Sequence, residues 1–482
     1  MERKWSPFQM AIFDFVENPD AGNGIVEAVA GSGKSTTIEH AIKRAKGSTI
    51  ILAFNKAIAD EMKARGVNAR TFHSLTYSPV CASRGARQVD MDKLHNLCKA
   101  NFSGNDMFMY GTFAKRMVGL ARQVGIGCLV PDKENAWYDI CAHHDIEPEH
   151  EEADLGRGIE LSRKLLELSN AAKSVDFDDM LYLSVKDGIS LPKFDFVFVD
   201  EAQDTNAIQR AILRKILRPG GRLIAVGDPA QAIYGFRGAD NHSLGLIGKE
   251  FNCTRLPLSI TYRCPASVVK YAQQWVSHIQ AADNAPEGKV EAIKAGWKLD
   301  IFVPGDLIVC RKAAPLLNLA YRFLRERRPA TILGREIGQG LAMLIRKMNA
   351  PDIDALQVAL FAYEEREVEK AQAKGDEAKV EALLDKVGAI RVLADSLEET
   401  NRTVQGLLQT LDQLFSNKAG AVLLATIHKS KGLEADNVYW LGRDECPAKW
   451  ARQDWQRQQE VNLCYVATTR AKKALYTFSL GE

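Results

Sequence analysis

The chain has 482 residues, of which 46% are hydrophobic, and its 63 basic and 61 acidic side chains leave a formal net charge of only +2. A chain of this length and apolar content can bury several cores, which suggests about three or four domains at roughly 150 residues each. The near-balance of charge excludes a protein that holds a polyanion over its whole surface, so any nucleic-acid surface is expected to be local.

The nine cysteines are scattered, with no CxxC spacing and no histidine pair placed to complete a zinc site. Residues 1–5 are not followed by the apolar stretch of a signal peptide, and no segment approaches the roughly 20 apolar residues that span a bilayer. We therefore expect reduced thiols, a cytoplasmic location and no membrane partner.

Eight short runs of β-branched, aromatic and other apolar residues predict strands. They are residues 25–30, 49–54, 194–200, 222–227, 307–310, 421–426, 437–441 and 474–479. Continuous apolar runs are typical of parallel strands that are covered on both faces. Helical patterns lie between the runs, so the sequence predicts an α/β fold with two parallel-sheet lobes.

Each group of strands is interrupted by a long stretch that lacks convincing strands but is rich in helix formers. Because a structureless loop of such length is improbable, both stretches are predicted to be mainly helical insertions. The first lobe then comprises residues 1–83 and 186–250, with its insertion at 84–185. The second lobe comprises residues 251–335 and 421–482, with its smaller insertion at 336–420.

A glycine-rich segment, residues 28–35 (AVAGSGKS), follows the first predicted strand and opens a predicted helix. In this position, backbone N–H groups and the helix N-terminus face bound phosphates, a lysine reaches the β and γ oxygens, and a serine hydroxyl ligates Mg²⁺. The sequence therefore predicts a site for ATP and Mg²⁺. Its residues are Gly31, Ser32, Gly33, Lys34, Ser35 and Thr36.

Adjacent carboxylates, Asp200 and Glu201, end the buried run at 194–200. The carboxyl ends of strands form the ligand crevice of an α/β sheet, so these side chains are expected beside the phosphate loop. Asp200 is predicted to hold Mg²⁺, and Glu201 to orient or deprotonate the attacking water.

Further segments match, in order, the motifs of the UvrD/Rep helicases, a family that includes PcrA. The matching segments are residues 200–206 (DEAQDTN), 226–239 (VGDPAQAIYGFRGA), 261–263 (TYR), 426–434 (TIHKSKGLE) and 463–471 (LCYVATTRA). The chain thus resembles a superfamily 1A DNA helicase from Gln9 to Arg470, with the two insertions covered only by position. The resemblance implies that both lobes are RecA-like.

The resemblance also implies roles in nucleotide chemistry. It assigns adenine reading to Gln9, base stacking to Tyr262, ribose contact to Glu434, γ-phosphate sensing to Gln231, and the role of arginine fingers to Arg263 and Arg470. Arg470 follows the apolar run 465–467, which has the composition of a strand.

DNA contacts are implied in the same way. The candidates are Asn55, Lys56, Thr71, Phe72, His73, Tyr234, Phe236, Arg237, Thr426 and His428. The family has a residue between the aromatic and the Asn–Lys pair that is missing here, which argues against Phe54 as a stacking platform. Phe236 replaces the family's tryptophan, and the acidic segment 176–179 is interpreted mainly as a helix start.

The resemblance implies an ATP-dependent helicase that translocates 3′-to-5′ on single-stranded DNA. Its expected partners are single-stranded DNA and junctions of single- and double-stranded DNA, and it is expected to act as a monomer. Two alternatives stay open. One is a translocase or anti-recombinase that strips proteins without processive unwinding, and the other is a P-loop phosphotransferase, which would have a single lobe and no paired fingers.

Overall fold

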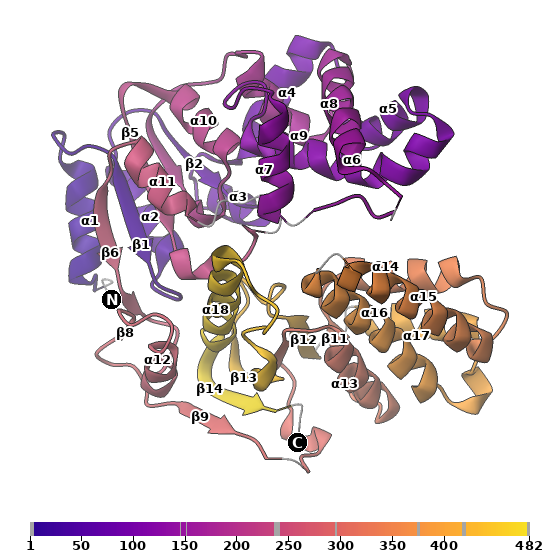
Figure 1. The fold of residues 1–482 in the computed structure, drawn as a ribbon. Coiled ribbons are helices and arrows are strands. Elements are labelled where there is room, and N and C mark those ends of the chain that lie inside the picture. The colour runs from indigo at the N-terminus through magenta and orange to yellow at the C-terminus, as the bar shows by residue number, and fades with distance from the viewer. Residues whose placement is uncertain are drawn as a thin grey trace. The chain divides into compact units, whose positions relative to one another are not determined.

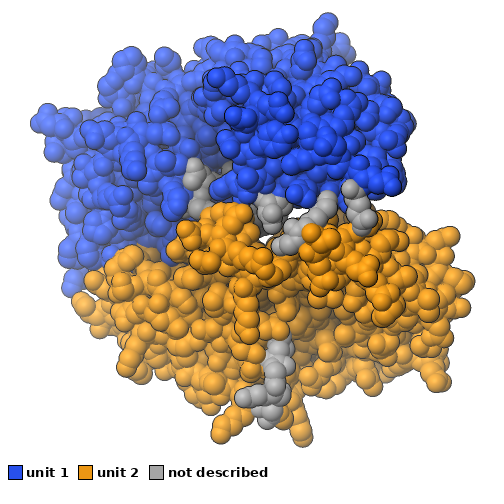
Figure 2. All heavy atoms as spheres, viewed as in Figure 1, with its two compact units in different colours: residues 1–28, 33–259 blue, residues 29–32, 260–482 orange. Residues whose placement is uncertain are grey.

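The computed structural model describes residues 4–144, 146–150, 152–235, 242–294, 296–373, 376–416 and 421–479, apart from the side chain of Glu336. Its contacts divide the chain into two compact units (Figure 2). The first unit contains residues 1–28 and 33–259, and the second contains residues 29–32 and 260–482. Among the described residues, no helix combines the length and the apolar character that crossing a bilayer requires.

The first unit is built on a six-stranded parallel sheet in the order β3-β2-β4-β5-β1-β6. Figure 1 labels β1, β2, β5 and β6 of this sheet. Its strands are β1 (Gly24–Ala28), β2 (Thr49–Ala53), β3 (Ala69–Thr71), β4 (Phe194–Val199), β5 (Leu217–Gly227) and β6 (Thr254–Leu258). All four apolar runs predicted for this unit form strands.

Both faces of this sheet are covered. On one face, Ile51 and Phe198 pack with α1 (Pro7–Glu17), α2 (Lys34–Arg44) and α3 (Lys56–Ala64). On the other face, the intervening residues of the same strands pack into a second core. Its helices include α4 (Phe72–Arg84), α10 (Ala207–Ile216) and α11 (Ser243–Glu250). Since successive strand side chains point to opposite faces, two cores explain why the inner strands are apolar throughout.

Helices fill most of the described chain between β3 and β4 and gather beside the sheet (Figure 1). They are α5 (Lys93–Asn101), α6 (Gly104–Val124), α7 (Glu134–His144), α8 (Leu155–Ala171) and α9 (Phe177–Lys186). The interpretation of the acidic segment at 176–179 as a helix start is confirmed. Asp176 caps α9, accepting from the Asp179 backbone N–H, while Asp179 accepts from the Asp176 backbone N–H.

The second unit is built on another six-stranded parallel sheet, in the order β11-β12-β10-β13-β14-β9. Its strands are β9 (Lys289–Ala292), β10 (Leu307–Cys310), β11 (Ala330–Ile332), β12 (Val422–Thr426), β13 (Ala435–Leu441) and β14 (Ala471–Phe478). A separate pair, β7 (Ile260–Thr261) and β8 (Gln280–Ala281), precedes them. The four apolar runs predicted for this unit also form strands, so the α/β class with two parallel sheets is confirmed.

The helices of the second unit are α12 (Ala266–Ala272), α13 (Ala314–Arg325), α14 (Arg335–Met348), α15 (Ile353–Ala373), α16 (Glu377–Ser396), α17 (Val404–Leu414) and α18 (Asp454–Thr468). The strand-like interpretation of residues 465–467 is wrong, because they lie near the end of α18. Residues 463–468 are all buried, and an apolar run in a fully buried helix has no periodicity that distinguishes it from a strand.

Candidate functional site

The glycine-rich loop passes directly into α2, whose first residue is Lys34. Gly33 precedes the helix with φ of +79°, a left-handed conformation that glycine adopts without steric cost. The Ser32 side chain is fully buried, and its Oγ has no hydrogen-bond partner among the described residues. A buried hydroxyl without a partner is costly unless a ligand satisfies it, so Ser32 and the helix N-terminus fit a phosphate group.

A continuous set of polar contacts, here called the motor network, joins five side chains of the first unit. Lys34 Nζ lies 2.9 Å from Glu201 Oε1, and Gln203 Nε2 donates to Glu201 Oε2. Gln203 Oε1 accepts from the Asp228 backbone N–H at 3.0 Å, and Gln231 Nε2 donates to Asp228 Oδ2 at 2.7 Å. The phosphate loop, the end of β4 and the end of β5 are thereby connected through side chains.

The charges of this network are mutually dependent. Burial by itself lowers the pKa of Lys34, but the nearby carboxylates of Glu201, Asp228 and Asp200 outweigh it and raise that pKa. Burial raises the pKa of Asp228, and Lys34 opposes that shift only in part. A buried cation surrounded by carboxylates is suited to a ligand that brings both anionic phosphates and a divalent cation.

The backbone at Glu201 is strained. Its φ of +51° and ψ of +42° place a non-glycine residue in the left-handed region, which costs of order 1–2 kcal/mol. The Glu201 N–H donates to Asp200 Oδ1 at 2.9 Å, so the turn that carries the strain also orients the neighbouring carboxylate. A strained backbone of this kind is kept only where the surrounding structure holds it in place, and such residues are concentrated at functional sites.

Asp200 is 4% exposed and stands at the end of β4, while Ser35 lies in the first turn of α2. Among the described residues, no group of three or more His, Cys, Asp or Glu side chains could by itself hold a metal ion. Mg²⁺ is commonly bound by one or two carboxylates together with water and substrate phosphates. The available oxygens therefore fit a magnesium ion that arrives with a nucleotide.

Gln203 and Asp228 belong to the motor network but are not among the predicted site residues. Asp228 directly follows β5, as Asp200 directly follows β4. A carboxylate at the end of a second predicted strand could therefore have identified Asp228 from the sequence. No sequence pattern identifies Gln203, because its contact with Asp228 exists only when β4 and β5 are neighbours in the sheet, and the sequence does not give the strand order.

Alanine at Gly227 is expected to lower ATP turnover and to destabilise the first unit by about 1–3 kcal/mol. A Cβ there would lie 2.4 Å from Gln203 Oε1 and 3.1 Å from the Gln203 backbone N, which forces the amide out of the motor network. Thermal unfolding and ATPase assays check this result. The control is Gly245→Ala in α11, where nothing lies within 4 Å of the added Cβ and stability should not fall.

Gln9 lies close to the phosphate loop. Its Nε2 donates to Thr37 Oγ1 at 2.9 Å in α2, and its Oε1 accepts from the Ser6 backbone N–H at 3.1 Å. The amide is 4% exposed and is thus held in one orientation by α1 and α2. Its second N–H and its remaining lone pair match the acceptor and donor on an adenine edge.

Four candidates lie together in the second unit. Arg263 Nε donates to Glu434 Oε2 at 2.7 Å, and Arg263 Nη1 donates to the Thr469 carbonyl at 3.2 Å. Arg470 is 1% exposed and donates to the carbonyls of Val466 and Leu433 at 2.9 and 3.2 Å. The ring of Tyr262 is 50% exposed and is available for stacking.

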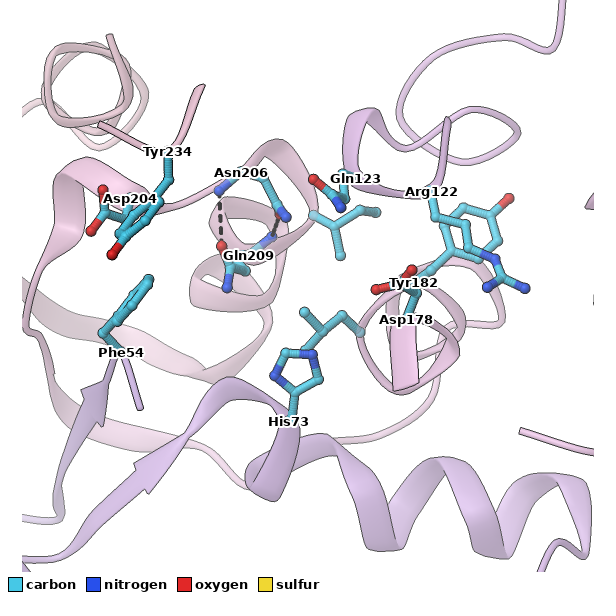
Figure 3. Close-up of a pocket in the computed structure, with 12 residues that line it drawn as sticks. Phe54, His73, Arg122, Gln123, Asp178, Tyr182, Asp204, Asn206, Gln209 and Tyr234 are labelled. Atoms are coloured by element: carbon cyan, nitrogen blue, oxygen red, sulfur yellow. Dashed lines mark hydrogen bonds between the residues drawn. The ribbon is translucent and has the colours of Figure 1, made fainter. Parts of the chain in front are cut away.

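The DNA candidates of the first unit are divided between surface and core. Phe54 is 46% exposed, and its ring stacks on Tyr234 with centroids 5.9 Å apart and an interplanar angle of 10° (Figure 3). The exposed ring at Phe54 differs from the sequence interpretation, which argued against a stacking platform there. Phe72 is only 5% exposed and packs in the core, so the structure does not bring its ring to this face.

The remaining candidates are placed as follows. Asn55 caps α3 and is exposed, as is Lys56, while Thr71 caps α4. His73 stacks on Phe177 with centroids 4.0 Å apart, and burial lowers its pKa to about 4. Thr426 ends β12, with His428 two residues later, and both are partly exposed. Phe236 and Arg237 lie outside the described residues.

Two family models match the chain. Residues 133–252 match the UvrD/REP helicase N-terminal domain, and residues 339–480 match the UvrD-like helicase C-terminal domain. The chain belongs to the UvrD-like helicases of superfamily 1A. The matched ranges of this family contain Glu201, Gln231, Glu434 and Arg470, whereas Lys34 lies outside them.

Relatives extend the similarity to almost the whole chain. The chain is 26% identical to F-box DNA helicase 1 of Gallus gallus, over 93% of this chain and 46% of that protein. It is 26% identical to F-box DNA helicase protein 1 of Schizosaccharomyces pombe, over 93% of this chain and 55% of that protein. It is 23% identical to DNA helicase II of Haemophilus influenzae, over 96% of this chain and 82% of that protein. The chain thus spans about half the length of the two F-box relatives.

Proposed function

We propose that this protein is an ATP-driven DNA helicase that moves along single-stranded DNA in the 3′-to-5′ direction. The observation that carries the proposal is the motor network, which runs from Lys34 to Gln231 and ends three residues before Tyr234, a member of the stacked aromatic pair. A change at the phosphate loop can therefore reach a base-stacking surface through one short segment. The names of the relatives, all of them DNA helicases, support the same activity.

Bound ATP with Mg²⁺ supplies the phosphoryl group whose transfer to water drives the motor. Lys34, Ser32 and the N-terminus of α2 hold the phosphates, and Ser35 with Asp200 holds the magnesium ion. Glu201 orients the attacking water and accepts its proton. Gln231 senses the terminal phosphate, Arg263 and Arg470 stabilise the charge on the transferred group, and Gln9, Tyr262 and Glu434 bind the nucleoside.

Single-stranded DNA and its junctions with duplex are the proposed substrates. Aromatic surfaces suit a motor that crosses any sequence, because every base can stack on a ring. The 3′-to-5′ polarity rests on the form of segment 231–238 (QAIYGFRG), which resembles that of the 3′-to-5′ branch. The helices within 84–185 and 336–420 support the proposal that each lobe carries an insertion.

Alanine at Phe54 is expected to weaken single-strand binding by about 1–3 kcal/mol, because one stacking ring is lost. The ring is half exposed, so the melting temperature should change little. Fluorescence anisotropy with a labelled oligonucleotide at fixed salt measures the affinity. The control is Phe108→Ala, which removes a 69% exposed ring of α6. Equal losses in the two variants would contradict a specific role for Phe54.

The central experiment compares ATP hydrolysis with and without single-stranded DNA and then measures strand displacement on 3′-tailed and 5′-tailed duplexes. Stimulation by DNA together with displacement from the 3′ tail supports the proposal. Stimulation without displacement would favour a translocase that strips bound proteins. Displacement from the 5′ tail alone would overturn the polarity.

A further inference from the structure

Residues 29–32 of the phosphate loop belong, by their contacts, to the second unit. The Ala30 N–H donates to the hydroxyl oxygen of Tyr465 at 2.9 Å. A Cβ added at Gly31 would lie 2.4 Å from Arg263 Cβ, so only glycine allows the loop backbone to lie this close to Arg263. This part of the loop is therefore held by residues outside the motor network, which lies in the first unit.

Tyr465 connects the loop to the end of α18. Both Tyr465 and Ala30 are buried. A buried N–H group without an acceptor is destabilising, so the Tyr465 hydroxyl is expected to stay beside the Ala30 N–H. Arg470 follows Tyr465 at the junction of α18 and β14 (Figure 1). The end of one helix thus carries both a contact with the phosphate loop and a candidate arginine finger.

Thr469, the C-terminal cap residue of α18, contacts both candidate arginine fingers. Its carbonyl accepts from Arg263 Nη1 at 3.2 Å, and its Oγ1 accepts from Arg470 Nη2 at 3.1 Å. The same Oγ1 donates to the Tyr465 carbonyl at 2.9 Å, one helical turn earlier. A hydroxyl has one hydrogen to donate, so donation to Tyr465 leaves its lone pairs for the Arg470 guanidinium.

These hydrogen bonds form one connected set, here called the finger network. Its members are Ala30, Tyr465, Thr469, Arg263 and Arg470, and all of them lie in the second unit. Displacement of a group that acts at the reacting atoms by about 1 Å can reduce turnover by about 10²-fold. The residues that hold the two guanidinium groups are therefore expected to affect catalysis without touching ATP.

We propose that Thr469 and Tyr465 are positioning residues, which hold the guanidinium groups of Arg263 and Arg470 in place relative to residues 29–32. The inference rests on the proposed function, since that function gives both arginines a role at the transferred phosphate. Thr469 connects the two arginines to each other through its carbonyl and its hydroxyl. Tyr465 connects this pair to the phosphate loop.

The neighbouring Thr468 shows what a buried threonine does at this helix end when it has only a structural role. Thr468 is buried, and its Oγ1 donates to the Cys464 carbonyl at 2.9 Å. Threonine hydroxyls in helices commonly make this bond to the carbonyl four residues earlier. Among the described residues, the Thr468 hydroxyl has no hydrogen bond with an arginine, whereas that of Thr469 accepts from Arg470. The two threonines thus form a matched pair for a test.

Thr469→Val keeps the shape of the side chain but removes the hydroxyl. It should lower kcat by about 10–100-fold and leave KM for ATP within about twofold, because the phosphate-binding groups of the first unit are unchanged. Thr469→Ser restores the hydroxyl and should return kcat to within about threefold of the unmodified protein. Tyr465→Phe removes the second hydroxyl and should lower kcat about tenfold, again with little change in KM. Steady-state ATPase assays of the full chain at saturating single-stranded DNA measure these values.

Two controls remove buried hydroxyls of the same kind. They are Thr468→Val and Tyr439→Phe, the second of which removes a hydroxyl of β13 that donates to the Ile301 carbonyl at 2.9 Å. Both should leave kcat within about twofold, although thermal unfolding should show a loss of stability like that of the test variants. In an Arg470→Lys background, Thr469→Val should lower kcat by less than about threefold further, because the planar fork that Thr469 orients is already absent.

The outcomes separate this inference from the proposed function. If the unmodified protein shows no ATP hydrolysis that DNA stimulates, the proposed function fails and the inference fails with it. If the unmodified protein is active but Thr469→Val and Tyr465→Phe behave like their controls, the inference is overturned and the proposed function stands. The inference is also overturned if Thr469→Val lowers kcat by the same factor with and without Arg470→Lys. If Thr469→Val does not fold, Tyr465→Phe and Tyr439→Phe provide the same comparison.

Discussion

Glutamine at Glu201 is expected to reduce ATP turnover by about 10²–10⁴-fold while ATP still binds, because the change removes the group that accepts the water proton. Lys34, Ser32 and Asp200, which are proposed to hold the nucleotide and its metal ion, are unchanged. Glutamine also preserves the length of the side chain, so it can still accept from Gln203 in the strained turn. Lys34→Ala should instead weaken ATP binding itself.

Single-turnover hydrolysis at saturating DNA and titration with a fluorescent ATP analogue distinguish these outcomes. The matched control is Glu250→Gln, a surface carboxylate of the same unit that pairs with Arg210 and Arg214. It should leave turnover within about twofold of the unmodified protein. Near-normal hydrolysis by Glu201→Gln would mean that another group accepts the proton.

The sequence predicts the inner strands of both sheets but not the outer ones. The eight apolar runs correspond to β1, β2, β4, β5, β10, β12, β13 and β14, whereas β3, β6, β9 and β11 lie at the ends of the two sheets. An outer strand has a neighbour on one side only and tolerates polar residues and proline. Pro257 in β6, and Lys289 and Glu291 in β9, are examples of such residues. They interrupt the run of apolar residues by which a strand is predicted from the sequence.

The site is predictable where chemistry requires a particular residue at a particular spacing. Lys34 and Glu201 stand out in the sequence because a phosphate loop and a strand end dictate their types, and the structure places them 2.9 Å apart. No comparable local motif shows whether an aromatic ring is exposed or buried. Phe54 and Phe72 both follow short strands, yet the first is on the surface and the second is in the core, because only tertiary packing decides which ring is covered.

A cavity of about 170 Å³ in the first unit, lined by Phe54, His73 and Asp178 among others, lies beyond what the sequence can show. Asp178 belongs to an acidic segment whose first residue, Asp176, caps a helix, and a cap is a sufficient explanation for carboxylates at such a position. Only the three-dimensional arrangement shows that Arg122 and Lys93 pair with Asp176 and Asp179, and that Asp178 and Arg122 both line this cavity. Asp178 lines it from α9 and Gln123 from α6, helices that are far apart in the sequence.

Alanine at Arg263 is expected to lower kcat by about 10³–10⁵-fold with little change in stability, as is typical of an arginine finger. Arg263 is 19% exposed in its side chain and pairs with the 45% exposed Glu434, so loss of this ion pair should cost less than about 1 kcal/mol. Arg402→Ala, which breaks an exposed ion pair with Asp354, is the matched control and should leave kcat unchanged.

Alanine at Arg470 should lower both kcat and the melting temperature, because its environment differs from that of Arg263. Arg470 is 1% exposed and donates to the buried carbonyl of Val466 and to the partly buried carbonyl of Leu433, and losing these hydrogen bonds should cost about 1–3 kcal/mol of stability. Arg470→Lys keeps the charge but cannot reproduce the planar fork, so kcat should stay low even if stability partly recovers.

Steady-state kinetics at saturating DNA, paired with thermal unfolding, separates the loss of turnover from the loss of stability. An unchanged kcat with a raised KM for ATP in Arg263→Ala would make that residue a binding group, and a full recovery of kcat in Arg470→Lys would exclude a finger role for Arg470.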